Sequence, residues 1–139
     1  MPSPDPEISK KVLQWLIYAD EDLNLASDAL NFTTNEPYRL IAYHAQQCAE
    51  KHLKAYLVFQ NVDFPYTHNI RRLLQLCSQY GTWPQSLENA KELTPYAVTT
   101  RYPGEDEVVT EEEARCSISL AQKVRDCVRT ELKKLGLKL

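Results

Sequence analysis

The sequence predicts an all-α fold, an up-and-down bundle of four to five helices that forms a single domain over residues 1–139. Two observations support this prediction. Apolar residues recur at three- and four-residue steps through nearly every segment, and no segment of useful length alternates as a strand would. Hydrophobic residues also make up 43% of the chain, so the bundle can bury a core.

The first predicted helix covers about residues 6–31. Asp5 can cap it, and Pro6 suits its first turn because an amide hydrogen there would have no partner in the helix. Its apolar stripe consists of Ile8, Val12, Trp15, Leu16, Ala19, Leu23, Ala26 and Leu30. The polar cluster at residues 33–35 is expected to end this helix and to cap the next one.

The second predicted helix covers about residues 36–61 and has an apolar face beside a polar edge. His52 falls on the apolar face, which predicts a hydrogen-bonded core histidine. At about 100° per residue, four other side chains share the adjoining edge. These are His44, Gln47, Lys51 and Lys54. A third helix over about residues 68–80 is expected to start at a Thr67 cap and to stop at Gly81.

The remaining helices are predicted from their boundaries. A weaker helix should follow Pro84, and Pro95 is expected to break it, or to restart it with the preceding threonine as a new cap. The segment RYPGED at residues 101–106 has the composition of a turn. The last helix has the clearest start, a capping box formed by Thr110 and Glu113.

Charge and cysteine spacing exclude several classes of function. The net charge of −3 argues against a general binder of duplex DNA, which usually has a basic surface. Residues 39–72 nevertheless hold five basic against two acidic residues, so a local patch suits a phosphate-bearing ligand. The four cysteines lack CxxC spacing and predict no zinc site. Without a signal-peptide core or a membrane-spanning run, the chain is expected to be cytoplasmic, with reduced thiols.

Four sequence blocks stand out, in order along the chain. The first is Trp15 with residues 20–23, and the second is YHAQQCAEKHLKAYL at residues 43–57. The third is FPYTHNI at residues 64–70, and the fourth is TTRYPGE at residues 99–105. Together these blocks resemble the HEPN family (higher eukaryotes and prokaryotes nucleotide-binding). With the helix spacing, the resemblance covers nearly the whole chain.

The resemblance implies a helical bundle that is often a homodimer. Such proteins are frequently encoded beside a minimal nucleotidyltransferase, as a toxin–antitoxin-like pair. Their fold is similar to the helical domain of kanamycin nucleotidyltransferase, which suggests nucleotide binding in a groove along the second helix and the 101–104 turn. No resident cofactor or metal is implied. The candidate ligand-binding residues are His44, Gln47, Lys51, Lys54, His68, Arg101 and Tyr102.

Each candidate also has a structural interpretation. The helix edge can be a solvated or packing face on which Glu50 and Lys54 form an i,i+4 pair. His68 can support the start of the third helix, while Arg101 and Tyr102 can anchor their loop. On this interpretation the protein is a purely structural dimer.

A further alternative is a metal-independent ribonuclease toxin. Active relatives carry an arginine and a histidine separated by four to six residues, and four residues separate Arg39 from His44. A histidine can serve as general acid or base while an arginine stabilises phosphate charge. However, the two side chains lie about 140° apart on one helix, so a second subunit or a frayed first turn is needed. Arg101, the later candidate, has no histidine after it.

Overall fold

The computed structural model describes residues 4–32, 34–97 and 108–139. Five helices follow one another in these ranges, and no strand occurs within them. They are α1 (Pro6–Ala29), α2 (Tyr38–Phe59), α3 (Ile70–Cys77), the 3₁₀-helix η1 (Gln85–Ala97) and α4 (Glu111–Lys134). The predicted all-α class and helix number are confirmed.

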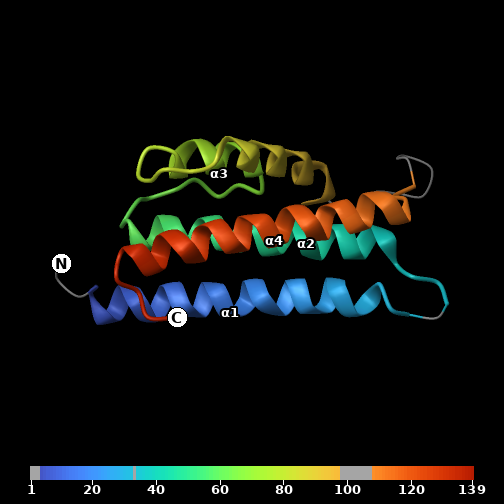
Figure 1. Cartoon of the computed structure of the whole chain (residues 1–139), viewed down its shortest axis with the longest axis horizontal. Helices are drawn as coiled ribbons and strands as arrows, with labels where there is room; N and C mark the ends of the chain where they lie inside the picture. The colour runs from blue at the N-terminus through green and yellow to red at the C-terminus, as the bar shows by residue number, and fades with distance from the viewer. Residues whose placement is uncertain (1–3, 33, 98–107) are drawn as a thin grey trace.

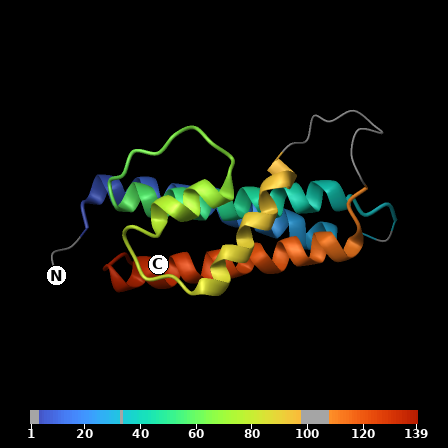
Figure 2. The ribbon, with the colours of Figure 1, turned by 90° about the horizontal axis from the view of Figure 1, so that it is seen from above.

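Three long helices form the body of the bundle. Helix α1 runs antiparallel to α2, and α4 runs in the direction of α2 (Figure 1). The shorter α3 and η1 lie on the side of α2 and α4 away from α1 (Figures 1 and 2). Among the described helices, α1 contacts α2 and α4 but neither α3 nor η1. The molecule therefore has an α1–α2 face and a separate α3–η1 face.

The core divides along the length of the bundle. Large side chains such as Leu53, Tyr56 and Leu73 fill the part beneath α3 and η1. The other part contains many alanines, which permit α1, α2 and α4 to approach closely. They are Ala19, Ala26, Ala29, Ala45, Ala114 and Ala121.

Several predicted helix ends are confirmed. The Asp5 side chain accepts a hydrogen bond from the Glu7 amide, and both bonds of the Thr110–Glu113 capping box are present. Helix α2 ends in a Schellman motif in which the Val62 amide donates to the Leu57 carbonyl over 3.0 Å.

The predicted start of the third helix is wrong. Asn69, not Thr67, caps α3, because its side chain accepts from the Arg72 amide over 3.1 Å. The Thr67 hydroxyl instead accepts from the Asn69 amide. Contacts of His68 with α2 hold this segment outside the helix. Helix α3 also ends at Cys77, so Gly81 lies beyond a turn and does not stop it directly.

Two other boundary predictions are wrong. Helix η1 continues through Pro95, whose fixed φ is compatible with a helical turn. Thr94 does not restart η1; its hydroxyl accepts from the Ile70 amide at the start of α3. Helix α2 begins after Pro37 without a side-chain cap, and Asn35 adopts a left-handed φ of 54° that turns the chain.

Candidate functional site

The polar edge predicted on α2 divides into two clusters that face different neighbours. His44 and Lys51 are seven residues apart, which is about two helical turns, and both face α1. Lys54 faces the segment between α2 and α3. The structure therefore does not bring all four edge residues into one group.

The first group, which we call the Asp22 cluster, consists of Asp22, His44 and Lys51. His44 Nδ1 donates to Asp22 Oδ1 over 2.8 Å, and Lys51 Nζ donates to Asp22 Oδ2. The His44 and Lys51 side chains remain 26% and 25% exposed, against 12% for Asp22. The carboxylate thus orients the imidazole, so that Nε2 is its acceptor nitrogen when the ring is neutral.

An apolar pocket of about 190 Å³ adjoins the Asp22 cluster. Leu25 and Phe32 line it from the side of α1, Leu40 from the start of α2, and His44 forms part of its wall. All three apolar side chains are exposed. A carboxylate-oriented histidine therefore borders an uncovered apolar surface.

The second group, which we call the Glu50 cluster, consists of Gln46, Glu50, Lys54 and His68. Glu50 accepts from Lys54 Nζ over 3.0 Å and from His68 Nδ1 over 2.8 Å. Gln46 Nε2 lies 3.1 Å from Glu50 Oε1 and 3.0 Å from the His68 carbonyl. Gln47, the remaining edge residue, donates to the Gln46 side chain over 2.7 Å.

The Glu50–Lys54 pair is buried. Only 4% of the Glu50 side chain and 7% of the Lys54 side chain are exposed, so the predicted i,i+4 pair exists but not on a solvated face. Aromatic rings complete the surroundings of the ammonium group, within the range of cation–π contacts. Lys54 Nζ lies 6.0, 5.9 and 5.9 Å from the ring centroids of Trp15, Phe64 and Tyr66. This cluster fixes the 60–69 segment onto α2.

A third polar cluster, absent from the sequence predictions, joins α1 to α4. Asp20 accepts from Arg125 Nε over 3.1 Å and from Arg129 Nη2 over 2.7 Å. His52 lies beneath it, fully buried, as predicted for a core histidine. Its Nδ1 donates to the Cys48 carbonyl over 2.9 Å, so Nε2 accepts from Arg129 Nε at 3.4 Å.

Burial controls the protonation of this third cluster. It lowers the pKa of His52 to about 4, because desolvation disfavours the charged imidazolium. It also raises the pKa of Cys48 to about 12, so that thiol stays protonated and packs as a hydrophobe. A positional signal existed in the sequence: Asp20 directly follows a residue of the apolar stripe of α1.

The remaining predicted residues are Arg39, Arg101 and Tyr102. Arg39 is exposed in the first turn of α2. Arg101 and Tyr102 lie outside the described residues, so the groove predicted toward the 101–104 turn stays a prediction. Within the described ranges, no three His, Cys, Asp or Glu side chains are grouped so that they could hold a metal ion.

The family model described as HEPN domain matches residues 12–132, which is most of the chain. The chain belongs to the HEPN family. This confirms the resemblance carried by the four sequence blocks. Comparison with curated proteins finds no match.

Two solved structures share the fold of this HEPN chain. TT1696 from Thermus thermophilus is 28% identical, with a TM-score of 0.77 over 88% of this chain and 98% of that chain. ST0689, an archaeal HEPN homologue, is 26% identical, with a TM-score of 0.70 over 87% of this chain and 97% of that chain. Among the described helices, none combines the length and apolar character that crossing a bilayer requires.

Proposed function

We propose that this HEPN protein is a cytoplasmic homodimer that pairs with a nucleotidyltransferase and holds a nucleotide at the Asp22 cluster. The observation that carries the proposal is the position of His44. Its ring is oriented by Asp22, lies on the same helix face as Lys51 and borders the apolar pocket. Cationic, hydrogen-bonding and apolar groups thus lie along one seam between α1 and α2, as small-molecule sites require.

The groups of the seam suit the parts of a nucleotide. Lys51 uses one of its three N–H donors on Asp22, which leaves two for a phosphate. His44 Nε2 has no partner within the described residues, so this nitrogen can form a hydrogen bond with the ligand. The pocket formed by Leu25, Phe32 and Leu40 offers an apolar surface for a base.

The same apolar residues favour a protein interface. Leu25, Phe32 and Leu40 are exposed together at one end of the α1–α2 face. Contiguous exposed apolar groups commonly mark interaction sites. A two-fold dimer that packs around this pocket would place the two Asp22 clusters near one axis and would enclose each base between the pocket and the second copy.

A ribonuclease is the second candidate function, and the His44–Asp22 pair is what favours it. A histidine oriented by a carboxylate is a common form of general acid or base. In a dimer, Arg39 of the second subunit would supply the phosphate-stabilising charge that helix geometry keeps away from His44 within one chain. Such a nuclease would need the same apolar interface.

Nucleotide binding is tested with ATP in titration calorimetry. His44→Ala and Lys51→Ala should each weaken ATP binding about tenfold, because each removes one direct contact. Lys133→Ala, an exposed lysine at the far end of α4, is the matched control and should bind normally. Undiminished affinity in both test variants would place the nucleotide elsewhere.

The assembly is tested by sedimentation and by co-expression with a nucleotidyltransferase encoded beside this chain. Phe32→Glu should give a monomer, whereas Tyr80→Glu, at an exposed tyrosine next to α3, should not. RNA incubated with the purified chain separates the two candidates. Cleavage that disappears in His44→Ala would favour the ribonuclease, and intact RNA would favour the binding module.

A further inference from the structure

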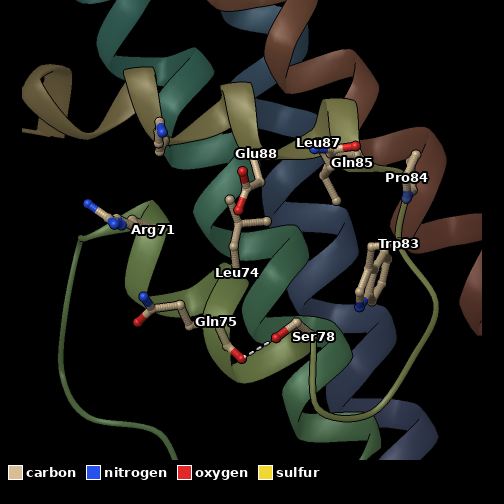
Figure 3. Close-up of a pocket in the computed structure, with 10 residues that line it drawn as sticks. Arg71, Leu74, Gln75, Ser78, Trp83, Pro84, Gln85, Leu87 and Glu88 are labelled. Carbon is tan, nitrogen blue, oxygen red and sulfur yellow. Dashed lines mark hydrogen bonds between the residues drawn. The ribbon is translucent and has the colours of Figure 1, made fainter.

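A cavity of about 360 Å³ lies between α3 and η1, on the face of the bundle that α1 does not reach (Figure 3). Its volume is within the range of small-molecule sites, roughly 300–1,000 Å³. Leu74 of α3 and Leu87 of η1 supply apolar lining. Among the described residues, no ligand residue predicted from the sequence lines this cavity, so the Asp22 cluster and the cavity are separate sites.

One end of the cavity presents a fixed aromatic ring, that of Trp83 (Figure 3). The indole N–H donates to the Cys77 carbonyl over 2.9 Å. The ring also meets Tyr56 edge-on, with centroids 4.7 Å apart and planes at 82°. Both contacts are made within the protein, and Tyr56 is fully buried, so neither contact depends on a ligand. The Trp83 ring is therefore in place before anything binds.

Gly81 permits this arrangement. A Cβ atom at residue 81 would come within 2.7 Å of the Tyr56 hydroxyl oxygen and 3.5 Å of the Trp83 ring. Real Cβ contacts are essentially never as short as the first of these distances, so glycine lets the turn pass close to both rings. Gly81 thus helps to fix the position of the Trp83 ring.

The opposite end of the cavity carries charge. Arg71 of α3 lies at this end in Figure 3, and Lys91 and Glu88 of η1 also line the cavity. Within the part of the chain that the structure describes, neither Arg71 nor Lys91 has a carboxylate at ion-pair distance. With Glu88 included, the lining has one net positive charge. The Arg71 guanidinium can hold a phosphate or carboxylate through two parallel N–H donors.

We propose that the α3–η1 cavity binds a small planar anion, a flat ring that carries one phosphate or carboxylate group. The ring packs against Trp83, and the anionic group is held by Arg71 and Lys91. A neutral ring lacks the charged contacts, and a free phosphate lacks the ring contact. This site does not depend on the nucleotide site proposed on the α1–α2 face.

The two tryptophans make the test specific. Trp15 and Trp83 each give one indole N–H signal in ¹H–¹⁵N NMR, and Trp15→Phe assigns them. AMP and benzoate are the two probes, one for each anionic group. At least one should shift the Trp83 signal saturably. The one that binds more tightly identifies whether phosphate or carboxylate is the natural group. If AMP is the tighter probe, adenosine and inorganic phosphate should each bind at least tenfold more weakly than AMP. If benzoate is the tighter probe, benzyl alcohol and acetate should each bind at least tenfold more weakly than benzoate.

Variants distinguish the built site from general attraction. Arg71→Ala should weaken binding of the better probe about tenfold, whereas Arg72→Ala, at the adjacent exposed arginine that does not line the cavity, should not. Glu88→Gln should tighten binding, because it removes the opposing charge. An unmoved Trp83 signal with both probes, or equal affinities in Arg71→Ala and the unmodified chain, would overturn the proposal.

Discussion

Asp22 and Glu50 each bind two basic side chains, yet their surroundings differ. Asp22 holds His44 and Lys51, which remain 26% and 25% exposed at the α1–α2 seam. Glu50 holds Lys54 and His68, but Glu50 and Lys54 are only 4% and 7% exposed. A buried ion pair is costly to break because it leaves an uncompensated charge, whereas solvent screens an open one. Burial, rather than residue type, therefore separates the structural half of the α2 edge from the half that a ligand can reach.

The largest effect on stability is expected from breaking the buried Glu50–Lys54 pair of α2. Glu50→Ala should lower the free energy of unfolding by about 3–5 kcal/mol, because Lys54 then keeps a buried charge without a carboxylate. Urea unfolding followed by circular dichroism measures the change.

A double variant sharpens that result. Glu50→Leu combined with Lys54→Met removes both charges and should cost much less than Glu50→Ala alone. A loss below about 1 kcal/mol in Glu50→Ala would mean that the pair is not buried in solution.

The next largest effect is expected at the buried histidine, His52, with the partly exposed His44 as its control. The pKa of His52 is lowered to about 4 by burial, while the unfolded chain titrates near 6.5. Below about pH 6.5 the unfolded state binds a proton that the folded state does not, so stability present at pH 7 is lost as the pH falls toward 4. The loss should reach roughly 3 kcal/mol.

Two variants identify the histidine responsible. His52→Leu should remove this part of the pH dependence, as measured by urea unfolding at pH 7 and pH 4.5. His44→Gln should retain it, because His52 is unchanged. Equal pH dependence in the unmodified chain and His52→Leu would contradict the assignment.

A smaller effect on stability is expected at the partly exposed Asp22 cluster. Asp22→Asn should destabilise the fold by only about 1 kcal/mol, because the amide still offers an acceptor and both bases remain in contact with water. Thermal unfolding at neutral pH provides the measurement. A loss as large as that of Glu50→Ala would show that the Asp22 cluster is structural too.

The smallest effect is expected at the surface. Lys134 pairs with Glu131 over 3.3 Å, and its side chain is 67% exposed. Lys134→Ala should change the free energy of unfolding by no more than about 0.5 kcal/mol. This variant calibrates the series, since a larger change would mean that surface pairs cannot serve as the baseline.

Local chemistry made most of the fold predictable from the sequence. The Thr110–Glu113 capping box and the Asp5 cap depend on neighbouring residues, and both are present. The burial of His52 follows from its place in the apolar periodicity of α2. The start of α3 was not predictable in this way, because contacts between His68 and α2 keep Thr67 from capping it.

The site was less predictable, because its partners are distant in sequence. Lys51 and Lys54 share an edge by helical spacing, but only the packing of α1 and of the 60–69 segment decides which carboxylate each one meets. Asp20 bonds to Arg129, which is 109 residues away. Such pairs depend on how whole helices are rotated against each other, which periodicity alone does not determine.

The histidines allow the most direct test of the claim that the Asp22 cluster is the ligand-binding half of α2. The chain has three histidines, and each gives separate imidazole signals in NMR that single substitutions can assign. Titration with ATP should shift the His44 signals saturably and leave those of buried His52 in place. His44 signals that stay unchanged while ATP binds would contradict the account.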